Sequence, residues 1–275
     1  MSSSRIERLI VVCCLVALAG IAAAQPVTPP LPMPGEIGKD VMWIPSDDVM
    51  VTRMLDVARV TSRDYLVDLG SGDGRVVIGA ARRGARALGI EYNPELVAYA
   101  RAQAAQSGLG GKARFVEGDL FRTDLIRATV ITMFLLEENN LKLRPKLLAL
   151  RPGTRIVSNS FSMGEWEPDG RQSASVQEGC TSYCEAYLWI VPAKVGGTWS
   201  VAGGEMTLKQ EFQRVTGTLK TGGSAFAVEG RLVGDRLSFG AGDRRYSGRV
   251  SGNAIKGTVK FDGGVSGWNA VRAGR

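Results

Sequence analysis

Short apolar segments alternate with segments of helical character between residues 65 and 191. This alternation is typical of a parallel β-sheet whose strands are connected by helices. A closing antiparallel hairpin is predicted from residues 172–177 and 183–191. Strands are predicted at 65–69, 87–91, 113–117, 129–135 and 155–158, and helices after Gly74, after Asn93-Pro94 and after Glu137.

The chain begins with the pattern of a secretory signal peptide. Arg5 and Arg8 precede 13 apolar residues, 9–21, and small alanines follow them. Residues 1–24 are therefore predicted to be a cleaved signal that exports the protein to the periplasm or beyond the cytoplasmic membrane. A membrane anchor formed by residues 9–24 is the alternative, although a membrane span requires about 20 apolar residues.

A proline-rich linker over residues 25–41 separates the signal from the folded chain. The first folded domain, residues 42–193, is predicted to open with a helix. Ser46 is its expected N-cap, and Met50 and Met54 begin its buried face.

Residues 195–275 differ from the rest of the chain in pattern and composition. They hold 18 of the 35 glycines, and their apolar positions alternate without a helical period. Segment 228–237 recurs as residues 246–255, and each copy has a Gly-Asp or Gly-Asn pair that suits a two-residue hairpin turn. We expect a small all-β antiparallel barrel or sandwich of seven or eight strands.

Composition narrows the chemistry and the partners. The 275 residues include no histidine, which excludes Ser-His-Asp and Cys-His nucleophiles and histidine-bound zinc, and no metal is expected. Residues 25–194 carry 20 basic and 20 acidic side chains, whereas residues 195–275 carry 12 basic and 6 acidic ones. The basic β-domain suggests an envelope or other anionic partner, but it shows no aromatic and basic platform of the kind that binds RNA, so nucleic acid is not expected.

Cysteine usage adds one expectation. Cys13 and Cys14 lie in the predicted signal, which leaves Cys180 and Cys184 in the folded chain. These two flank the tip of the closing hairpin. A disulfide between them is feasible in an oxidising compartment, and two free thiols are the alternative.

A glycine-rich loop follows the first predicted strand. Glycines at a strand-to-helix turn let the backbone approach a ligand closely, and the start of the helix offers free amide donors. The third glycine comes one position too early for a dinucleotide fingerprint, and the acid that precedes the first favours an ammonium or sulfonium ligand over a diphosphate. The candidate binding residues are Asp68, Gly70, Ser71, Gly72 and Gly74.

Acidic residues also mark the ends of the next two strands. Glu91 is placed to accept hydrogen bonds from both hydroxyl groups of a ribose. Asp119, followed by Leu120, is placed to accept the exocyclic amine of an adenine. Three acids in register at three successive strand ends point to one binding site for an adenosyl ligand.

With these motifs, residues 42–192 resemble the class I, or seven-β-strand, S-adenosylmethionine-dependent methyltransferases. Their first motif has the form acid-x-Gly-x-Gly-x-Gly, as residues 68–74 do. The resemblance implies an α/β fold with a doubly wound, mostly parallel seven-stranded sheet, and S-adenosyl-L-methionine as the cofactor. It also implies that the methionine moiety lies over residues 68–74, the ribose on Glu91 and the adenine at Asp119 and Leu120.

More narrowly, four segments are similar to lysine methyltransferases of mitochondrial inner-membrane proteins and to bacterial relatives of that branch. This similarity implies methyl transfer to a protein amine, with lysine as the expected acceptor. A small-molecule or other polymer acceptor is the alternative, and a non-catalytic envelope binding protein is an alternative of another class. The predicted export signal and the β-domain do not belong to the pattern of that branch. The similar segments are 43–46, 68–76, 144–147 and 166–169.

Four further residues are candidates for contact with the acceptor. Glu137 and Glu138 follow the fourth strand and are candidates for positioning an incoming ammonium, although acids in the first turn of a helix are favourable in their own right. Trp43 and Trp166 are candidates for the border of a substrate channel, with packing in the core or at its edge as the alternative. No catalytic residue is assigned from the sequence.

Overall fold

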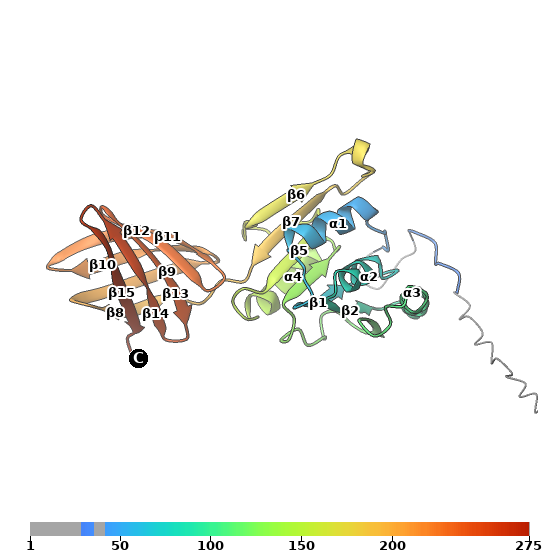
Figure 1. The fold of residues 1–275 in the computed structure, drawn as a ribbon, viewed down its shortest axis with the longest axis horizontal. Helices are drawn as coiled ribbons and strands as arrows, with labels where there is room; N and C mark the ends of the chain where they lie inside the picture. The colour runs from blue at the N-terminus through green and yellow to red at the C-terminus, as the bar shows by residue number, and fades with distance from the viewer. Residues whose placement is uncertain (1–28, 36–41, 275) are drawn as a thin grey trace, which may run out of the picture.

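The computed structural model describes residues 29–35 and 42–274, so the predicted signal peptide lies outside the described residues. Figure 1 shows two bodies in succession, a sheet with helices and a separate barrel of strands. Within the described part of the chain, no helix combines the length and the apolar character needed to cross a membrane.

A seven-stranded sheet forms the first body, with the strand order β3-β2-β1-β4-β5-β7-β6. The first five strands pair in parallel, while β7 pairs antiparallel with β5 and with β6. The direction of winding changes between β1 and β4, and in such sheets ligands bind outside the carboxyl ends of the strands at this switch point. The strands are β1 (Tyr65–Leu69), β2 (Arg86–Glu91), β3 (Ala113–Glu117), β4 (Val130–Met133), β5 (Arg155–Asn159), β6 (Gly170–Ser173) and β7 (Glu185–Ile190).

Helices cover both faces of this sheet. Leu66 of β1 packs in the same cluster as apolar residues of α1, α2 and α3, whereas the next residue, Val67, packs with those of α4. Successive strand residues point to opposite faces, so the parallel strands are buried on both sides. The helices are α1 (Asp48–Val57), α2 (Arg75–Arg82), α3 (Pro94–Gln106), α4 (Glu137–Leu148) and the short 3-10 helix η1 (Val176–Glu178).

The predicted strands β1 to β5 and the predicted helices are present, with two corrections. The first strand of the closing hairpin is β6 (Gly170–Ser173) rather than residues 172–177, because residues 176–178 form η1. The second correction is at the start of α1. Asp47, not Ser46, occupies the N-cap position, and its side chain makes no capping hydrogen bond. Ser46 is buried, and its hydroxyl accepts a hydrogen bond from Asn159 Nδ2 (3.0 Å). A tertiary contact at the end of β5 therefore uses the side chain that local capping rules assign to the helix.

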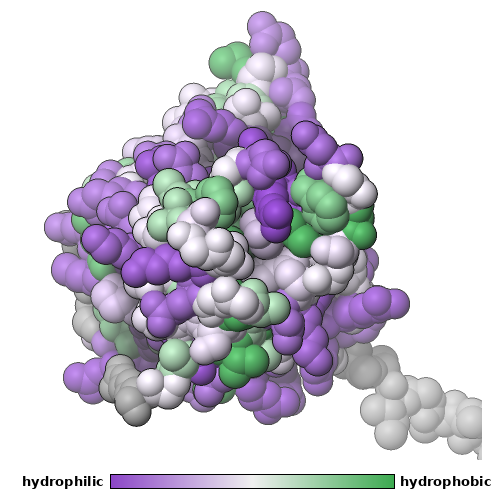
Figure 2. All heavy atoms as spheres, turned by 90° about the vertical axis from the view of Figure 1, so that its left-hand side faces the viewer, coloured by the Kyte–Doolittle hydropathy of each residue, from purple (hydrophilic) through white to green (hydrophobic). Residues whose placement is uncertain are grey.

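The second body is a closed eight-stranded antiparallel barrel with the order β10-β11-β12-β13-β14-β15-β8-β9. Large apolar side chains such as Trp199 and Met206 fill its interior, and Figure 2 shows mostly hydrophilic residues on the face it presents, with small apolar groups between them. Two-residue turns form at Gly234-Asp235 and Gly252-Asn253, as predicted. The strands are β8 (Gly197–Val201), β9 (Gly204–Glu211), β10 (Arg214–Thr221), β11 (Ser224–Val233), β12 (Arg236–Ala241), β13 (Arg244–Ser251), β14 (Ala254–Phe261) and β15 (Gly264–Arg272).

Trp166 lies where the two bodies meet. Its indole is fully buried and stacks on Phe212, from the β9–β10 turn of the barrel, with ring centroids 5.9 Å apart. Asp169 accepts hydrogen bonds from Arg231 of β11 (2.5 Å) and from the Ile190 amide (2.8 Å). The segment that resembles the lysine methyltransferases at residues 166–169 therefore docks the barrel.

Candidate functional site

One cavity opens at the carboxyl ends of β1, β2 and β4, next to the winding switch of the sheet. The glycine loop after β1 forms its floor, and residues before α1 contribute a second side. Of the residues singled out from the sequence, the structure brings these to the cavity lining: Trp43, Asp68, Gly70, Ser71, Gly72, Glu91, Asp119 and Leu120.

Asp68 is the penultimate residue of β1 and is 4% exposed. Its Oδ1 accepts a hydrogen bond from the Thr132 hydroxyl of the neighbouring strand β4 (2.6 Å). The pKa of Asp68 is raised to about 7, mainly by burial. The hydrogen bond from Thr132 lowers this pKa, and the nearby Glu91 and Asp73 carboxylates raise it. A positively charged ligand would offset this burial cost.

Glu91 connects the end of β2 to the glycine loop. The Gly72 amide donates to Glu91 Oε2 (2.8 Å), while the amides of Tyr92 and Asn93 donate to Oε1 (2.8 and 2.9 Å). Asn93 then caps α3 by accepting a hydrogen bond from the Glu95 amide. The carboxylate is thus fixed in orientation by backbone donors on both of its oxygens.

The third acid, Asp119, stands beyond the end of β3. Its Oδ1 accepts a hydrogen bond from the Phe121 amide (2.8 Å). Leu120 and Ile90 provide apolar surface beside it in the cavity lining. This combination of a fixed carboxylate and an apolar wall suits a flat aromatic base with an exocyclic amine.

Two glycines of the loop are required for different reasons. Gly72 has a positive φ of 51°, and a Cβ there would lie 2.4 Å from Trp43 Nε1, so the indole closes over the loop. Gly74 does not line the cavity, contrary to our expectation of cofactor contact. It caps α2 with φ 86°, and a Cβ there would lie 2.6 Å from Phe115 and 2.9 Å from Ala100.

The remaining candidates for acceptor contact lie away from the cavity. Glu137 and Glu138 are exposed in the first turn of α4, outside the cavity lining. Trp166 does not border a channel, because its ring is enclosed between α4, β7 and the barrel. Sequence reasoning missed Phe134, which lines the cavity directly after β4. Its position at the end of a predicted central strand was the signal that could have found it.

The glycine loop and its surroundings match a known methyltransferase family. Residues 68–170 match the family model described as the ANTKMT methyltransferase domain. A protein-lysine N-methyltransferase from Saccharolobus islandicus is 39% identical over 154 residues, which cover 55% of this chain and 94% of that protein. This chain belongs to the class I S-adenosylmethionine-dependent methyltransferases.

Two other relatives broaden the comparison. The adenine nucleotide translocase lysine N-methyltransferase of Mus musculus is 39% identical over 105 residues, which cover 38% of this chain and 46% of that protein, so this methyltransferase spans about half of that relative. The crystal structure of an RNA methyltransferase from Salinibacter ruber with S-adenosyl-L-homocysteine shares 44% identity at a TM-score of 0.50 and covers 55% of this chain and 96% of that one. These two alignments cover 38% and 55% of this chain.

The residues present fit the cofactor of this family. Three carboxylates surround the cavity, and burial of Asp68 beside two other acids favours a cationic ligand. Ser71 contributes a buried hydroxyl that has no hydrogen-bond partner among the described residues. Within the same part of the chain, no three side chains of His, Cys, Asp or Glu come together as a metal site.

Proposed function

We propose that this methyltransferase transfers a methyl group to the side-chain amine of a lysine in a protein. The lysine methyltransferases of Saccharolobus islandicus and Mus musculus support this acceptor by sequence similarity. The observation that carries the proposal is the joint placement of Asp68, Glu91 and Asp119 around a cavity that extends to Phe134 at the end of β4.

Each acid has a separate role in holding the cofactor. We assign the cationic methionine end to Asp68 and the glycine loop, the ribose hydroxyls to Glu91, and the adenine amine to Asp119 with Leu120 and Ile90 as its apolar wall. Trp43 lies against the loop at Gly72 and lines this side of the cavity. S-adenosylmethionine supplies an activated methyl group on a sulfonium, so the protein contributes binding, orientation and a dry site.

The acceptor requires little acid–base chemistry from the chain. A lysine amine must lose one proton before or during attack, and solvent or a carboxylate accepts it. The absence of histidine from the sequence therefore does not obstruct this reaction.

An RNA acceptor is the second candidate, because the Salinibacter ruber structure bears that name. Charge favours the protein acceptor: residues 25–194 carry equal numbers of basic and acidic side chains, and nucleic-acid binding depends on a local excess of Lys and Arg. None of the relatives named above supports a small-molecule acceptor.

The test begins with calorimetric titration of the full chain with S-adenosyl-L-homocysteine. We expect binding by the wild type and a loss of at least tenfold in affinity for Asp68→Ala and for Glu91→Ala. Radiolabelled methyl transfer to lysine-containing peptides and to RNA in parallel then distinguishes the acceptors. Transfer to RNA alone would overturn the lysine assignment, and an absence of cofactor binding would overturn the site.

We also propose that residues 1–24 direct export, and that the basic barrel contacts an anionic envelope component. The Cys180–Cys184 disulfide supports export, since disulfides persist in oxidising compartments. Fractionation of cells that express tagged chains with and without residues 1–24 tests the first part. Salt-sensitive cosedimentation of the full chain with anionic vesicles tests the second.

A further inference from the structure

Three aromatic side chains gather next to the cofactor cavity. Phe134 follows β4, Phe161 follows β5, and Tyr183 lies in the loop between β6 and β7. Their ring centroids are 5.1 Å apart for Phe134 and Tyr183, 5.7 Å for Phe161 and Tyr183, and 6.1 Å for Phe134 and Phe161. Phe134 lines the cavity and Tyr183 is 40% exposed, so the aromatic cluster begins at the cavity and ends at a partly exposed ring.

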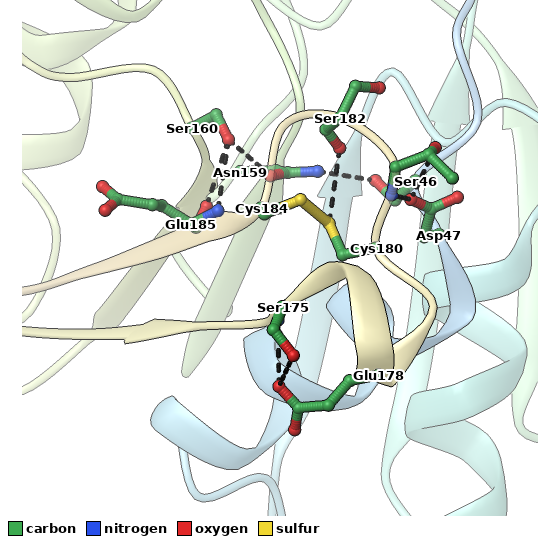
Figure 3. Close-up of a disulfide and its surroundings, with 11 residues drawn as sticks. Ser46, Asp47, Asn159, Ser160, Ser175, Glu178, Cys180, Ser182, Cys184 and Glu185 are labelled. Carbon is green, nitrogen blue, oxygen red and sulfur yellow. Dashed lines mark hydrogen bonds between the residues drawn. A yellow bond between two sulfur atoms is a disulfide. The ribbon is translucent and has the colours of Figure 1, made fainter.

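The loop that carries Tyr183 is held by several contacts, and Figure 3 shows the disulfide at its centre. Cys180 and Cys184 are joined across the residues that include Tyr183. The amide and hydroxyl of Thr181 both donate to Asp47 Oδ2 (2.7 and 3.1 Å), which ties the loop to the start of α1. The Cys180 amide donates to the Ser175 carbonyl (3.1 Å).

The backbone at Tyr183 adopts φ 57°, a left-handed conformation that is strained for an aromatic residue. Ser160, just before Phe161, has φ 59°. Strain of this kind persists where the surrounding structure enforces it, and it concentrates at functional sites. A half-exposed ring adds little to the core, so packing alone does not account for this conformation.

The aromatic faces of the cluster favour a cationic occupant. The faces of aromatic rings attract ammonium groups that lie within about 6 Å of the ring centroid. A cluster of aromatic faces that begins at the proposed methyl-donor cavity with Phe134 suits an alkylammonium better than an anion.

We propose that Phe134, Phe161 and Tyr183 form the acceptor subsite, which binds the ammonium end of the lysine side chain and of its methylated products. The disulfide loop holds Tyr183 in position over Phe134. This inference rests on the proposed function, because it assumes a lysine acceptor at the same cavity.

Binding of a methylated-lysine probe to the protein saturated with S-adenosyl-L-homocysteine tests the subsite. The probes are Nα-acetyl-Nε-trimethyl-lysine methyl amide and its neutral tert-butyl isostere, observed through NMR signals of labelled Phe and Tyr rings. We expect the cationic probe to shift the ring signals of the cluster and to bind about fivefold more tightly than the neutral one. Equal affinities, or no shift of these rings, would overturn the proposal.

Variants distinguish the contribution of each aromatic ring to probe binding from an effect on folding. Tyr183→Ala and Phe161→Ala should each weaken the cationic probe at least threefold with unchanged affinity for S-adenosyl-L-homocysteine, and Tyr183→Phe should retain wild-type binding. Val176→Ala, at an exposed apolar position in the same loop, is the matched control and should change nothing. A chain that fails to bind S-adenosyl-L-homocysteine would contradict the proposed function, whereas normal cofactor binding with probe affinity indifferent to Tyr183→Ala would contradict only the subsite.

Discussion

At the residue scale, the buried carboxylate of Asp68 lowers the stability of the protein without cofactor. A carboxylate buried near Glu91 and Asp73 favours its protonated form, and its pKa of about 7 expresses this. Thr132 compensates only in part through one hydrogen bond. A cation bound in the cavity would stabilise the ionised form of Asp68. The same burial that destabilises the protein without cofactor would therefore strengthen the attraction between Asp68 and a positively charged cofactor.

Cofactor affinity should therefore depend on pH. Below about pH 7, Asp68 is protonated and must release its proton when the cationic cofactor binds. The affinity for S-adenosylmethionine should rise by up to about tenfold per pH unit toward pH 7 and then level off. Calorimetry at pH 5.5, 6.5 and 8 in buffers of different ionisation heat measures both affinity and proton release; a flat profile would contradict this role.

The stability of the cofactor-free protein should show the opposite trend. Because the folded-state pKa of Asp68 exceeds the unfolded value of about 3.9, the folded state binds more protons between these values and loses stability as pH rises from about 4 to 7. Asp68→Asn should stabilise the cofactor-free chain by about 1–3 kcal/mol at pH 8 relative to wild type. Urea unfolding of both proteins at pH 5 and pH 8 tests this, and a variant less stable at both pH values would refute it.

Gly72 provides a second test at this scale. Alanine there combines a positive φ with a Cβ 2.4 Å from the Trp43 indole, so the cover of the loop must move. Gly72→Ala should lower affinity for S-adenosyl-L-homocysteine by at least tenfold, equivalent to about 1.4 kcal/mol. Gly110→Ala is the control, since no atom lies within 4 Å of the added Cβ. Equal affinities for the two variants in calorimetry would argue against contact between the loop and the cofactor.

At the element scale, the β6–β7 hairpin joins a structural role to the site. Its two strands complete the sheet, while its loop carries η1, the disulfide and Tyr183. Hydrogen bonds between Ser175 and Glu178 form a capping box that stabilises η1. The hairpin thus fixes an aromatic side chain near residues that follow β4 and β5 in the chain.

Reduction of the disulfide should loosen this loop without affecting the cofactor site. We expect faster amide hydrogen exchange at residues 175–184 in the presence of reductant and unchanged affinity for S-adenosyl-L-homocysteine. The double variant Cys180→Ser/Cys184→Ser should exchange rapidly with or without reductant. Exchange that is insensitive to reductant in the wild type would show that the other contacts suffice.

At the scale of the whole molecule, the barrel is docked onto the methyltransferase domain rather than loosely attached to it. Trp166 stacks on Phe212, Arg144 lies over the same ring (5.5 Å to its centroid), and Arg231 pairs with Asp169. The Asp169 side chain is 4% exposed, so loss of this partner leaves a buried acceptor less well satisfied.

Arg231→Ala should lower the free energy of unfolding by about 1–2 kcal/mol, since Arg231 itself is partly exposed and water replaces some of the lost interaction. Arg236→Ala, at an exposed position on the adjacent strand β12, should change it by less than about 0.5 kcal/mol. Urea unfolding of each variant, followed by the fluorescence of the five tryptophans, which include Trp166 at the junction, tests this. Identical midpoints for the two variants would show that the ion pair does not contribute to docking.

The sequence predicted those elements accurately whose structure depends on residues close by in the chain. Apolar runs indicated the strands β1 to β5, Asn93-Pro94 marked the start of α3, and Gly-Asp and Gly-Asn pairs located two barrel turns. These signals reflect local backbone geometry and burial on known faces. The place of the glycine loop at the cavity could also be predicted, because strand ends in a parallel sheet share one edge.

Only the tertiary structure decided the roles that depend on distant contacts. Gly74 is required because Phe115 and Ala100 approach it, and Ser46 is drawn to Asn159 instead of capping α1. Trp166 serves the barrel rather than a channel, since its stacking partner lies 46 residues along the chain.

The aromatic cluster arises from the same cause, because Phe134, Phe161 and Tyr183 belong to three separate segments. Strand order and the hairpin loop set the distances between their rings, and no pattern within any one segment encodes them. The sequence by itself thus determined the fold class and the glycine loop, whereas the sheet order and the hairpin loop determined which side chains meet beside the cavity.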